Sequence, residues 1–241
     1  MQPIIAGHRG VAGLYPENTR SSIMAAIQLG LEWIEVDVQP TKDNQLVVIH
    51  DHTIDRCSNG SGRVDSYTME ELRRFDFGRW FSAEFAGETI LTLHELLAIA
   101  ADHPISLNLE IKLDQTSINR GVVKTTVQTL QQVLAASAVN KNQILLSSFA
   151  KEVMNELAEQ CLNYKLGLIS EKLTSEDIAH LQAIGAYSCH LNYAETSEDD
   201  INLLHEAGYR VWCYTVNQPK DFPQLSAVDA IFSDYPQRFM R

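Results

Sequence analysis

Short apolar segments rich in β-branched residues alternate along most of the chain with longer segments of helical periodicity. The strand-like segments span residues 3–8, 32–38, 46–50, 106–111, 143–147, 164–169, 187–191, 210–215 and 230–233. The helical segments span residues 18–29, 92–103, 117–136, 150–161, 175–184, 197–207 and 219–225. Segment 46–50 is expected to extend the second strand, which leaves eight core strands interleaved with helices. In a chain of 241 residues, this repetition favours an α/β fold closed into a (β/α)8 TIM barrel over a doubly wound open sheet.

One long interruption breaks the alternation between residues 51 and 90. Loops between strands and helices usually run about 2–6 residues, so this stretch is predicted to be a structured insertion after the second strand. A capping box from Thr68 to Glu71 predicts a short helix within it. Five aromatic residues are expected to form a small core that holds the insertion against the barrel: Phe75, Phe77, Trp80, Phe81 and Phe85. A substrate lid formed by one or two of them is the alternative. Composition shows no other boundary, so residues 1–241 are predicted to form a single domain.

The ends of the predicted strands carry the residues capable of chemistry, because the active sites of barrels lie at the carboxyl ends of their strands. The second strand carries Glu35 and Asp37, and the third core strand carries Glu110 followed by Lys112. Residues two apart in a strand point to the same face, so each pair projects together. Because the second strand alternates apolar and acidic residues, its apolar face is expected to meet the helices. Its acids are then expected to point inward near the barrel mouth.

Three carboxylates that converge at one mouth repel one another strongly unless a cation lies among them. Ligands that are all oxygen favour a hard divalent ion such as Mg²⁺ or Ca²⁺ over zinc. The predicted metal ligands are therefore Glu35, Asp37 and Glu110. The alternative is a buried network in which the same acids pair with Arg9, Lys112 and other basic groups.

Two histidines, His8 and His50, also stand at predicted strand ends. Histidine is the natural proton-transfer group near neutral pH, and two of them beside a carboxylate cluster indicate general acid–base chemistry. Either one by itself would more often be structural. His190 and Asn192, near the end of the sixth core strand, are expected to be satisfied polar groups of the core, with contact to substrate as the alternative.

The overall charge constrains what such a site must do. Lys and Arg total 19 against 31 Asp and Glu, a net charge of −12, so the chain lacks the basic surface typical of nucleic-acid binders. An anionic substrate must then be attracted by a local positive site, which a bound cation would supply. The four cysteines are scattered without a CxxC pair, which is typical of reduced thiols. With no signal peptide and no apolar run of about 18 residues, a cytoplasmic location without stable membrane association is expected.

A series of short motifs follows in order along the chain. They are His8-Arg-Gly10, Pro16-Glu-Asn-Thr19, Glu35-Val-Asp37, Thr41-Lys-Asp43, Val47-Val-Ile-His-Asp51, Asp55-Arg56 with Gly60 and Gly62, Glu110-Ile-Lys112, Leu146-Ser-Ser-Phe149, Tyr214-Thr-Val-Asn217 and Ser233-Asp234. Together they resemble the glycerophosphodiester phosphodiesterase family, of the bacterial cytosolic type, over nearly the whole chain. His-Arg-Gly alone would be a weak signal, whereas the combined order and spacing are highly specific.

The resemblance implies a barrel with an insertion after its second strand and a site that holds a divalent metal. The implied site consists of two catalytic histidines, His8 and His50, two phosphate-binding cations, Arg9 and Lys112, and three metal ligands, Glu35, Asp37 and Glu110. The chain departs from the family pattern in two places. Leu91-Thr-Leu-His94 stands where the family often has Pro-Thr-Leu-Glu, and Tyr214 stands where it usually has tryptophan. An aromatic ring is kept at this second position, and Tyr214 is predicted to bind substrate.

The implied activity is metal-dependent hydrolysis of a small-molecule glycerophosphodiester to glycerol 3-phosphate and an alcohol. A phosphodiester anion resists attack, so the site must neutralise a non-bridging oxygen while it moves protons. We expect the glycerol 2-hydroxyl to attack phosphorus and form a cyclic phosphate that water then opens, with His8 as base and His50 as acid.

Two other functions are compatible with these residues. One is a lysophospholipase D or sphingomyelinase-like enzyme that uses the same groups on a lipid, and the absence of an extended amphipathic basic stretch argues against it. The other is a non-catalytic barrel that binds a phosphorylated ligand. The presence of both histidines together with all three acids argues against this second alternative.

Overall fold

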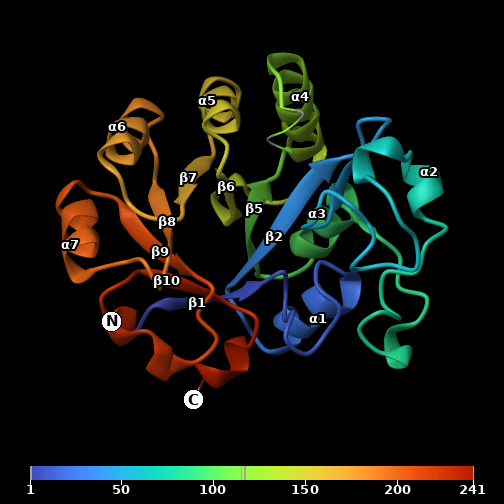
Figure 1. Cartoon of the computed structure of the whole chain (residues 1–241), viewed down its shortest axis with the longest axis horizontal. Helices are drawn as coiled ribbons and strands as arrows, with labels where there is room; N and C mark the ends of the chain where they lie inside the picture. The colour runs from blue at the N-terminus through green and yellow to red at the C-terminus, as the bar shows by residue number, and fades with distance from the viewer. Residues whose placement is uncertain (1, 115, 117, 241) are drawn as a thin grey trace.

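The computed structural model describes residues 2–114, 116 and 118–240, and within them parallel strands close into a barrel (Figure 1). The barrel strands are β1 (Ile4–His8), β2 (Trp33–Pro40), β5 (Ser106–Ile111), β6 (Ile144–Ser148), β7 (Lys165–Ser170), β8 (Ser188–Asn192), β9 (Arg210–Tyr214) and β10 (Ala230–Ser233). Each strand pairs in parallel with the next, and β1 pairs with both β2 and β10, so the ring is closed. The predicted (β/α)8 TIM barrel is confirmed.

Helices cover the outside of the barrel between successive strands, as Figure 1 shows. They are α1 (Arg20–Gln28), α3 (Leu93–Ala101), α4 (Arg120–Ala136), α5 (Lys151–Gln160), α6 (Ser175–Ala183) and α7 (Glu198–Glu206). Capping boxes begin α3, α6 and α7 and satisfy backbone N–H groups of the first turn. The buried faces of the helices join strand residues such as Val36, Leu107 and Leu109 in the main core. The predicted start of α4 at residue 117 lies outside the described residues.

The helix predicted at residues 219–225 is wrong. The chain forms the 3₁₀ turns η4 (Pro219–Asp221) and η5 (Pro223–Ser226) instead, with Phe222 between them in an extended conformation. Pro223 lacks a backbone N–H and disfavours helical geometry at the residue before it. An α-helix therefore cannot run through this position.

An antiparallel extension follows β2, as predicted. β3 (Leu46–Val48) pairs with β2, and β4 (Leu91–Thr92) pairs with β3. Beyond β3, the side-chain amide nitrogen of Gln39 lies 2.8–2.9 Å from the carbonyl oxygens of residues 49–51. These contacts hold the backbone of His50 against β2, although the strand itself ends two residues earlier than predicted.

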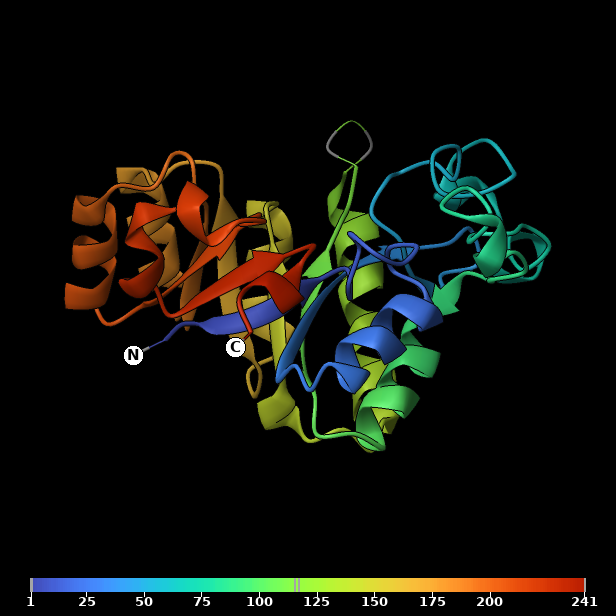
Figure 2. The same ribbon diagram turned by 90° about the horizontal axis from the view of Figure 1, so that it is seen from below.

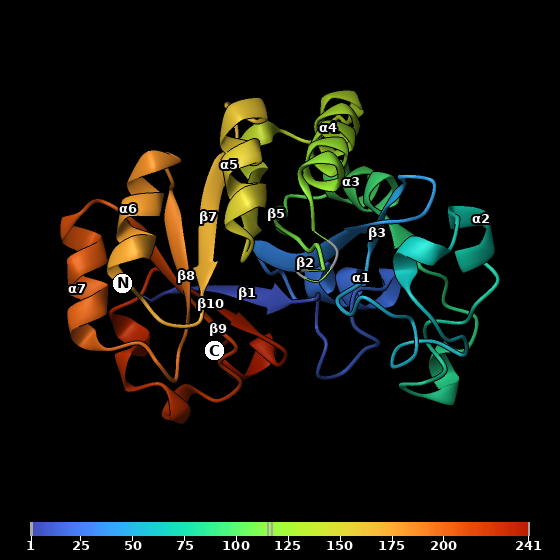
Figure 3. The same ribbon diagram turned by 45° about the horizontal axis from the view of Figure 1, so that its top comes forward.

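Between β3 and β4 the chain forms a lobe with a small apolar core. The lobe contains η1 (Val64–Ser66), α2 (Met69–Leu72) and η2 (Ala83–Phe85), and α2 begins at the predicted capping box. Its core consists of Val47, Ile49, Ile54, Val64, Met69, Leu72, Phe77 and Ile90. In Figures 2 and 3 the lobe, coloured cyan to green, projects from the side of the barrel opposite α6 and α7. The division into one domain, residues 1–241 with an insertion at 51–90, stays a prediction, and residues 1 and 241 lie outside the described residues.

Part of the predicted aromatic cluster belongs to this core, and part does not. Phe77 is buried in it and Phe75 packs against it. Phe81 and Phe85 instead pack on each other, with ring centroids 5.8 Å apart, and Trp80 is exposed. Aliphatic side chains of β3 and of the lobe make up most of the core, which leaves these three rings outside it.

Candidate active site

The carboxylates predicted to bind a metal converge at the carboxyl ends of β2 and β5. Glu35 and Asp37 alternate along β2 with apolar residues of the core, and Asp37 lies opposite Glu110 of β5. One carboxylate oxygen from each of the three residues lies within 4.8 Å of the others. The residues are 3%, 1% and 9% exposed, respectively. The alternation of apolar and acidic positions therefore brings these acids together inside the barrel.

Lys112 and Arg9 lie against these acids. Lys112 Nζ is 2.7 Å from Glu110 Oε1 and 3.3 Å from Asp37 Oδ1, and Arg9 Nε is 3.3 Å from Asp37 Oδ2. Burial acts to raise the pKa of Asp37, but the charges of Lys112 and Arg9 outweigh it and hold the pKa below its usual range. The ion-pair network that the sequence offered as an alternative is therefore present, and it centres on Asp37.

The negative charge of Glu35 is the one that this network compensates least. Its Oε2 accepts a hydrogen bond from the backbone N–H of Arg9 at 3.1 Å, whereas its Oε1 is buried without a hydrogen-bond partner among the described residues. Burial, followed by the charges of Asp37 and Glu110, raises the pKa of Glu35 well above its ordinary value. Three carboxylates beside two cations leave an excess of negative charge. An oxygen-only cluster with an unpartnered buried oxygen fits a hard divalent cation, which these three acids would hold.

His8 is oriented by an acid from the other end of the chain. Its Nδ1 lies 2.7 Å from Asp234 Oδ1, and its Nε2 faces Glu35 Oε2 at 3.8 Å. Asn217 holds Asp234 in place, because its side-chain amide donates to Asp234 Oδ2 at 2.8 Å and accepts from the Asp234 backbone N–H at 2.9 Å. A carboxylate on Nδ1 favours the tautomer that carries its proton there, which leaves Nε2 as the proton acceptor.

His50 has a similar partner in its neighbour Asp51, whose Oδ1 lies 2.7 Å from His50 Nδ1. Arg56 holds Asp51 with two further hydrogen bonds, from Nε at 2.7 Å and from Nη2 at 2.9 Å. Burial is the largest influence on His50 and lowers its pKa, with Arg9 and Lys112 acting in the same direction and Asp37 opposing them. In the substrate-free protein the ring therefore favours its neutral form more than an ordinary histidine does.

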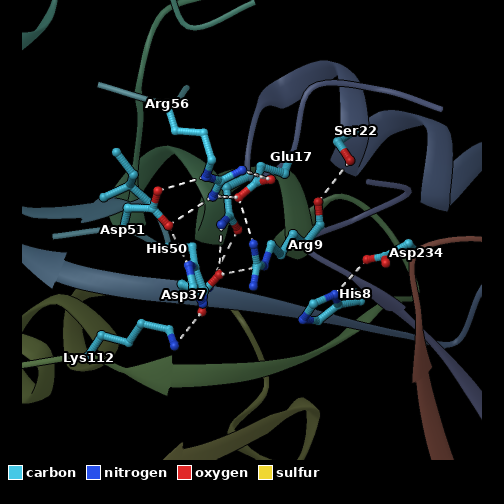
Figure 4. A network of polar contacts seen from close by, with 12 residues as sticks. His8, Arg9, Glu17, Ser22, Asp37, His50, Asp51, Arg56, Lys112 and Asp234 are labelled. Atoms are coloured by element: carbon cyan, nitrogen blue, oxygen red, sulfur yellow. Dashed lines mark hydrogen bonds and ion pairs between the residues drawn. The ribbon is translucent and has the colours of Figure 1, made fainter. Parts of the chain in front are cut away.

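Glu17 joins the two arginines into one network, which Figure 4 shows. Arg9 Nη1 donates to Glu17 Oε1 at 2.8 Å, and Arg56 donates to both oxygens of Glu17 at 2.7 and 2.8 Å. Contacts therefore run without a break from His50 through Asp51, Arg56, Glu17 and Arg9 to Asp37. Sequence reasoning did not assign roles to the acids that orient the histidines or to the acid shared by the arginines. All of them lie in the motifs that carry the family resemblance, which was the available signal.

We expect Arg56→Ala to lower kcat about 10-fold, because Asp51 then loses the fork that holds it against His50. Arg56→Lys should recover little of this loss, since an ammonium cannot reproduce the forked geometry. Steady-state kinetics across pH measures the effect, and the pH profile should shift because His50 is oriented through Asp51. Arg63→Ala is the matched control: Arg63 also pairs with two acids, but they are Asp65 of the lobe and Asp114 of the segment after β5 rather than Asp51. Equal losses in both variants would contradict a positioning role for Arg56.

The predicted catalytic and phosphate-binding residues surround one cavity of about 180 Å³. It is lined by His8, Arg9, Glu35, His50, Asn108, Glu110, Lys112, Phe149, Ile169, His190, Tyr214, Thr215 and Phe232. A larger depression of about 620 Å³ between the lobe and α4 shares only Lys112 with this set of lining residues. The smaller cavity therefore brings together both histidines, both cations and two of the three acids.

Tyr214 lines the cavity with its ring rather than with an available hydroxyl group. Its hydroxyl lies 3.0 Å from the Ser170 carbonyl oxygen and 3.1 Å from Glu171 Oε2. The ring packs edge-on against Phe149 with centroids 5.9 Å apart. A contact between Tyr214 and substrate would therefore be an apolar contact through the ring.

Comparison with known proteins identifies the family of this chain. The model of the glycerophosphoryl diester phosphodiesterase family matches residues 8–238. The chain belongs to this family. It is 30% identical over 239 residues to a glycerophosphodiester phosphodiesterase of Caldanaerobacter subterraneus subsp. tengcongensis, covering 98% of this chain and 96% of the relative. A glycerophosphodiester phosphodiesterase of Bacillus altitudinis is also 30% identical, over 98% of this chain and 96% of its own length.

Solved structures support the same assignment. A phosphodiesterase of Oleispira antarctica, solved in complex with the product sn-glycerol 3-phosphate, superposes with a TM-score of 0.92 at 28% sequence identity. The superposition covers 98% of this chain and 95% of that one. Among the described residues, no helix combines the length and apolar character needed to cross a membrane. The family match and these relatives identify the chain as an enzyme of the phosphodiester hydrolase class on a barrel scaffold.

Proposed function

We propose that this protein hydrolyses glycerophosphodiesters to glycerol 3-phosphate and an alcohol, and that it requires Mg²⁺ or Ca²⁺ held by Glu35, Asp37 and Glu110. One observation carries the proposal: three buried acids, with carboxylate oxygens within 4.8 Å of one another, lie beside a cavity that two histidines and two cations also line. The product found in the Oleispira antarctica relative supports glycerol 3-phosphate as the class of product.

Arg9 and Lys112 are proposed to bind the phosphoryl oxygens. Both line the cavity, and the side chain of each is 16% exposed, so their charges are poorly screened by water. The neighbouring acids raise the pKa of both side chains despite the opposing effect of burial, so both stay charged. Glu35, Asp37 and Glu110 would hold a divalent cation, which would supply further positive charge to the phosphoryl group.

The two histidines are proposed to move the protons. His8 accepts the proton of the glycerol 2-hydroxyl on Nε2, while Asp234 stabilises the imidazolium that forms. The hydroxyl oxygen bonds to phosphorus and forms a cyclic phosphate as the bond from phosphorus to the leaving alcohol breaks. His50 donates a proton to the oxygen of that alcohol, and Asp51 keeps its ring oriented. In the second step, which opens the cyclic phosphate, the same two groups exchange these roles with water as the nucleophile.

The lowered pKa of His50 gives a pH dependence with a definite sign. A general acid must be protonated, and this form is present below its pKa and lost above it. In the free enzyme we therefore expect kcat/KM to fall as His50 loses its proton. The midpoint of this fall should lie below about pH 6.5, the ordinary pKa of histidine. A bound phosphodiester anion adds negative charge and raises this pKa, so the corresponding fall in kcat should lie at higher pH. Coincident midpoints in the two profiles would contradict the assignment of His50 as the acid.

The activity is tested with purified protein stripped by EDTA and reloaded with Mg²⁺ or Ca²⁺. The substrate panel comprises glycerophosphocholine, glycerophosphoethanolamine and lysophosphatidylcholine, with separate detection of glycerol 3-phosphate and lysophosphatidic acid. Release of glycerol 3-phosphate from the first two supports the proposal. Turnover of the lysolipid alone would assign the lysophospholipase D activity instead, and binding of glycerol 3-phosphate without any turnover would assign a ligand-binding barrel.

A further inference from the structure

Two polar side chains of the cavity, Asn108 and His190, take no part in the chemistry described so far. Asn108 is 1% exposed, and neither its amide nitrogen nor its amide oxygen has a hydrogen-bond partner among the described residues. His190 is 0% exposed, and its Nδ1 is likewise without a partner there. Buried polar groups are nearly always hydrogen-bonded, so these atoms indicate a ligand. The expectation that His190 is a satisfied core residue therefore fails for one of its nitrogens.

The fold holds both side chains in defined positions. Asn108 lies on β5 directly opposite Glu35, and its neighbours Leu107 and Leu109 belong to the core beneath the helices. It therefore points to the inside of the barrel, on the same face as Glu110.

His190 lies across the barrel on β8, with Nε2 at 2.9 Å from Ser188 Oγ and its ring stacked on Trp212 at a centroid distance of 5.4 Å. Gly167 of β7 makes room for this ring, because a Cβ there would lie 2.6 Å from His190 Nε2. The imidazole is thus held in place by the stacking on Trp212 and the hydrogen bond to Ser188, in space that the missing side chain of Gly167 leaves open.

The chemistry of these atoms specifies the kind of group they would bind. Burial lowers the pKa of His190 to about 3, so the ring is neutral, with one nitrogen that donates and one that accepts. The Asn108 amide also offers a donor and an acceptor without charge. A hydroxyl group both donates and accepts, so it matches them, whereas neither of these two neutral side chains offers a charge to a phosphate or an ammonium group. The charged groups Arg9 and Lys112 serve the phosphoryl group instead.

The size of the cavity agrees with a short polyol. At about 180 Å³ the cavity is small and must also admit the phosphoryl group beside Arg9 and Lys112, so it leaves room for only a short chain. Phe232 and Ile169 also line it and would contact the carbon atoms.

We infer that Asn108 and His190 bind the terminal hydroxyl of the glycerol moiety and so select phosphodiesters that carry a free glycerol. This inference rests on the proposed function, because it requires a glycerophosphodiester in the cavity. The glycerol then lies inside the barrel, and the phosphoryl group lies beside Arg9 and Lys112. The leaving alcohol makes no contact with Asn108 or His190, so these residues determine specificity for the glycerol side alone.

The test compares two substrates with metal-loaded enzyme. One is glycerophosphocholine, and the other is its analogue in which hydrogen replaces the terminal hydroxyl of the glycerol while the attacking 2-hydroxyl is kept. Wild type should favour the first by about 10- to 100-fold in kcat/KM, because the analogue leaves buried polar atoms unpartnered. Asn108→Leu and His190→Phe should lose activity on glycerophosphocholine and reduce the preference to about 1-fold.

Ser147→Ala is the matched control. Ser147 lies on β6 opposite Glu110 and is 0% exposed. Within the described part of the chain its hydroxyl also has no hydrogen-bond partner, and it is not among the residues that line the cavity. This variant should keep the preference of the wild type. Melting temperatures separate binding from folding: Asn108→Leu should melt no lower than wild type, because an apolar group replaces unpartnered buried atoms.

Calorimetric titration of wild type with sn-glycerol 3-phosphate and with 1,2-propanediol phosphate gives a readout that depends on neither the variants nor turnover. Tighter binding of the first by a similar factor supports the inference. Equal kcat/KM and equal affinity for the two members of each pair would overturn the inference while leaving the proposed function intact. Failure of metal-loaded wild type to hydrolyse any glycerophosphodiester would overturn the proposed function itself.

Discussion

Replacing His8 or His50 by alanine should lower kcat by about 100- to 10,000-fold while leaving the melting temperature nearly unchanged. Each imidazole is oriented through Nδ1 by a carboxylate at 2.7 Å, so the proposed proton transfer uses Nε2 and depends on the ring being present. The side chains of His8 and His50 are 16% and 33% exposed, and barrel residues at strand ends serve the site more than the fold. Steady-state kinetics and thermal unfolding measure the two effects separately.

His205→Ala is the control for this pair. His205 Nε2 also lies 2.8 Å from a carboxylate oxygen, that of Asp229, but on α7, away from the predicted metal ligands. Its loss should leave kcat unchanged. A near-normal kcat after the loss of His8 or His50 would remove that histidine from the mechanism.

The division of roles between the histidines is tested with the double variant and with an activated substrate. Because both groups serve one reaction, the double variant should lose less than the product of the single losses. A substrate with a very good leaving group needs less help from a general acid, so it should preferentially rescue His50→Ala. Rescue of His8→Ala instead would reverse the assignment of base and acid.

Removal of the divalent cation by EDTA should abolish turnover, and Mg²⁺ or Ca²⁺ should restore it. Glu35→Gln, Asp37→Asn and Glu110→Gln should each weaken metal binding and lower activity at least about 100-fold, since each removes one of three clustered carboxylates. Added metal should also raise the melting temperature of wild type, because a ligand that binds only the folded state stabilises it, and should raise that of the variants less. Full turnover by metal-free protein would refute the metal requirement.

The same substitutions should differ in their effects on the stability of the metal-free protein. Glu35→Gln should maintain or raise the melting temperature, because burial and two neighbouring carboxylates disfavour the charged form of Glu35 and the amide is neutral at every pH. Asp37→Asn should lower it, because Asp37 pairs with both Lys112 and Arg9. Lys112 and Arg9 each keep a second acid, so the free energy of unfolding should fall by only about 1–3 kcal/mol. Each kcal/mol should lower the melting temperature by about 2–4 °C. Equal effects of the two substitutions would contradict this account of the charges.

Local patterns along the chain were sufficient for the barrel and for its acidic centre. Repeated alternation of apolar strands with helical segments predicted the order of elements, because each element buries one apolar face and its period appears in the sequence. Alternation along β2 placed Glu35 and Asp37 on one face, and the barrel rule placed them at the same end as Glu110. Where local chemistry was overlooked, the prediction failed, as with the helix predicted across Pro223.

The sequence by itself determined the fold class, the order of elements and the convergence of the three acids. The first two follow from the spacing of apolar residues, which repeats every two residues in strands and every three to four in helices. The third follows from the position of the acids at the carboxyl ends of strands. Only the tertiary structure decided which acids lie against His8 and His50. Asp234 meets His8 across 226 positions of the chain, and Glu17 meets Arg56 across 39. The structure alone also revealed the unpartnered atoms of Asn108 and His190. The contact between Asp234 and His8 depends on closure of the ring between β1 and β10, and no local pattern encodes the distance between side chains that the closed barrel brings together.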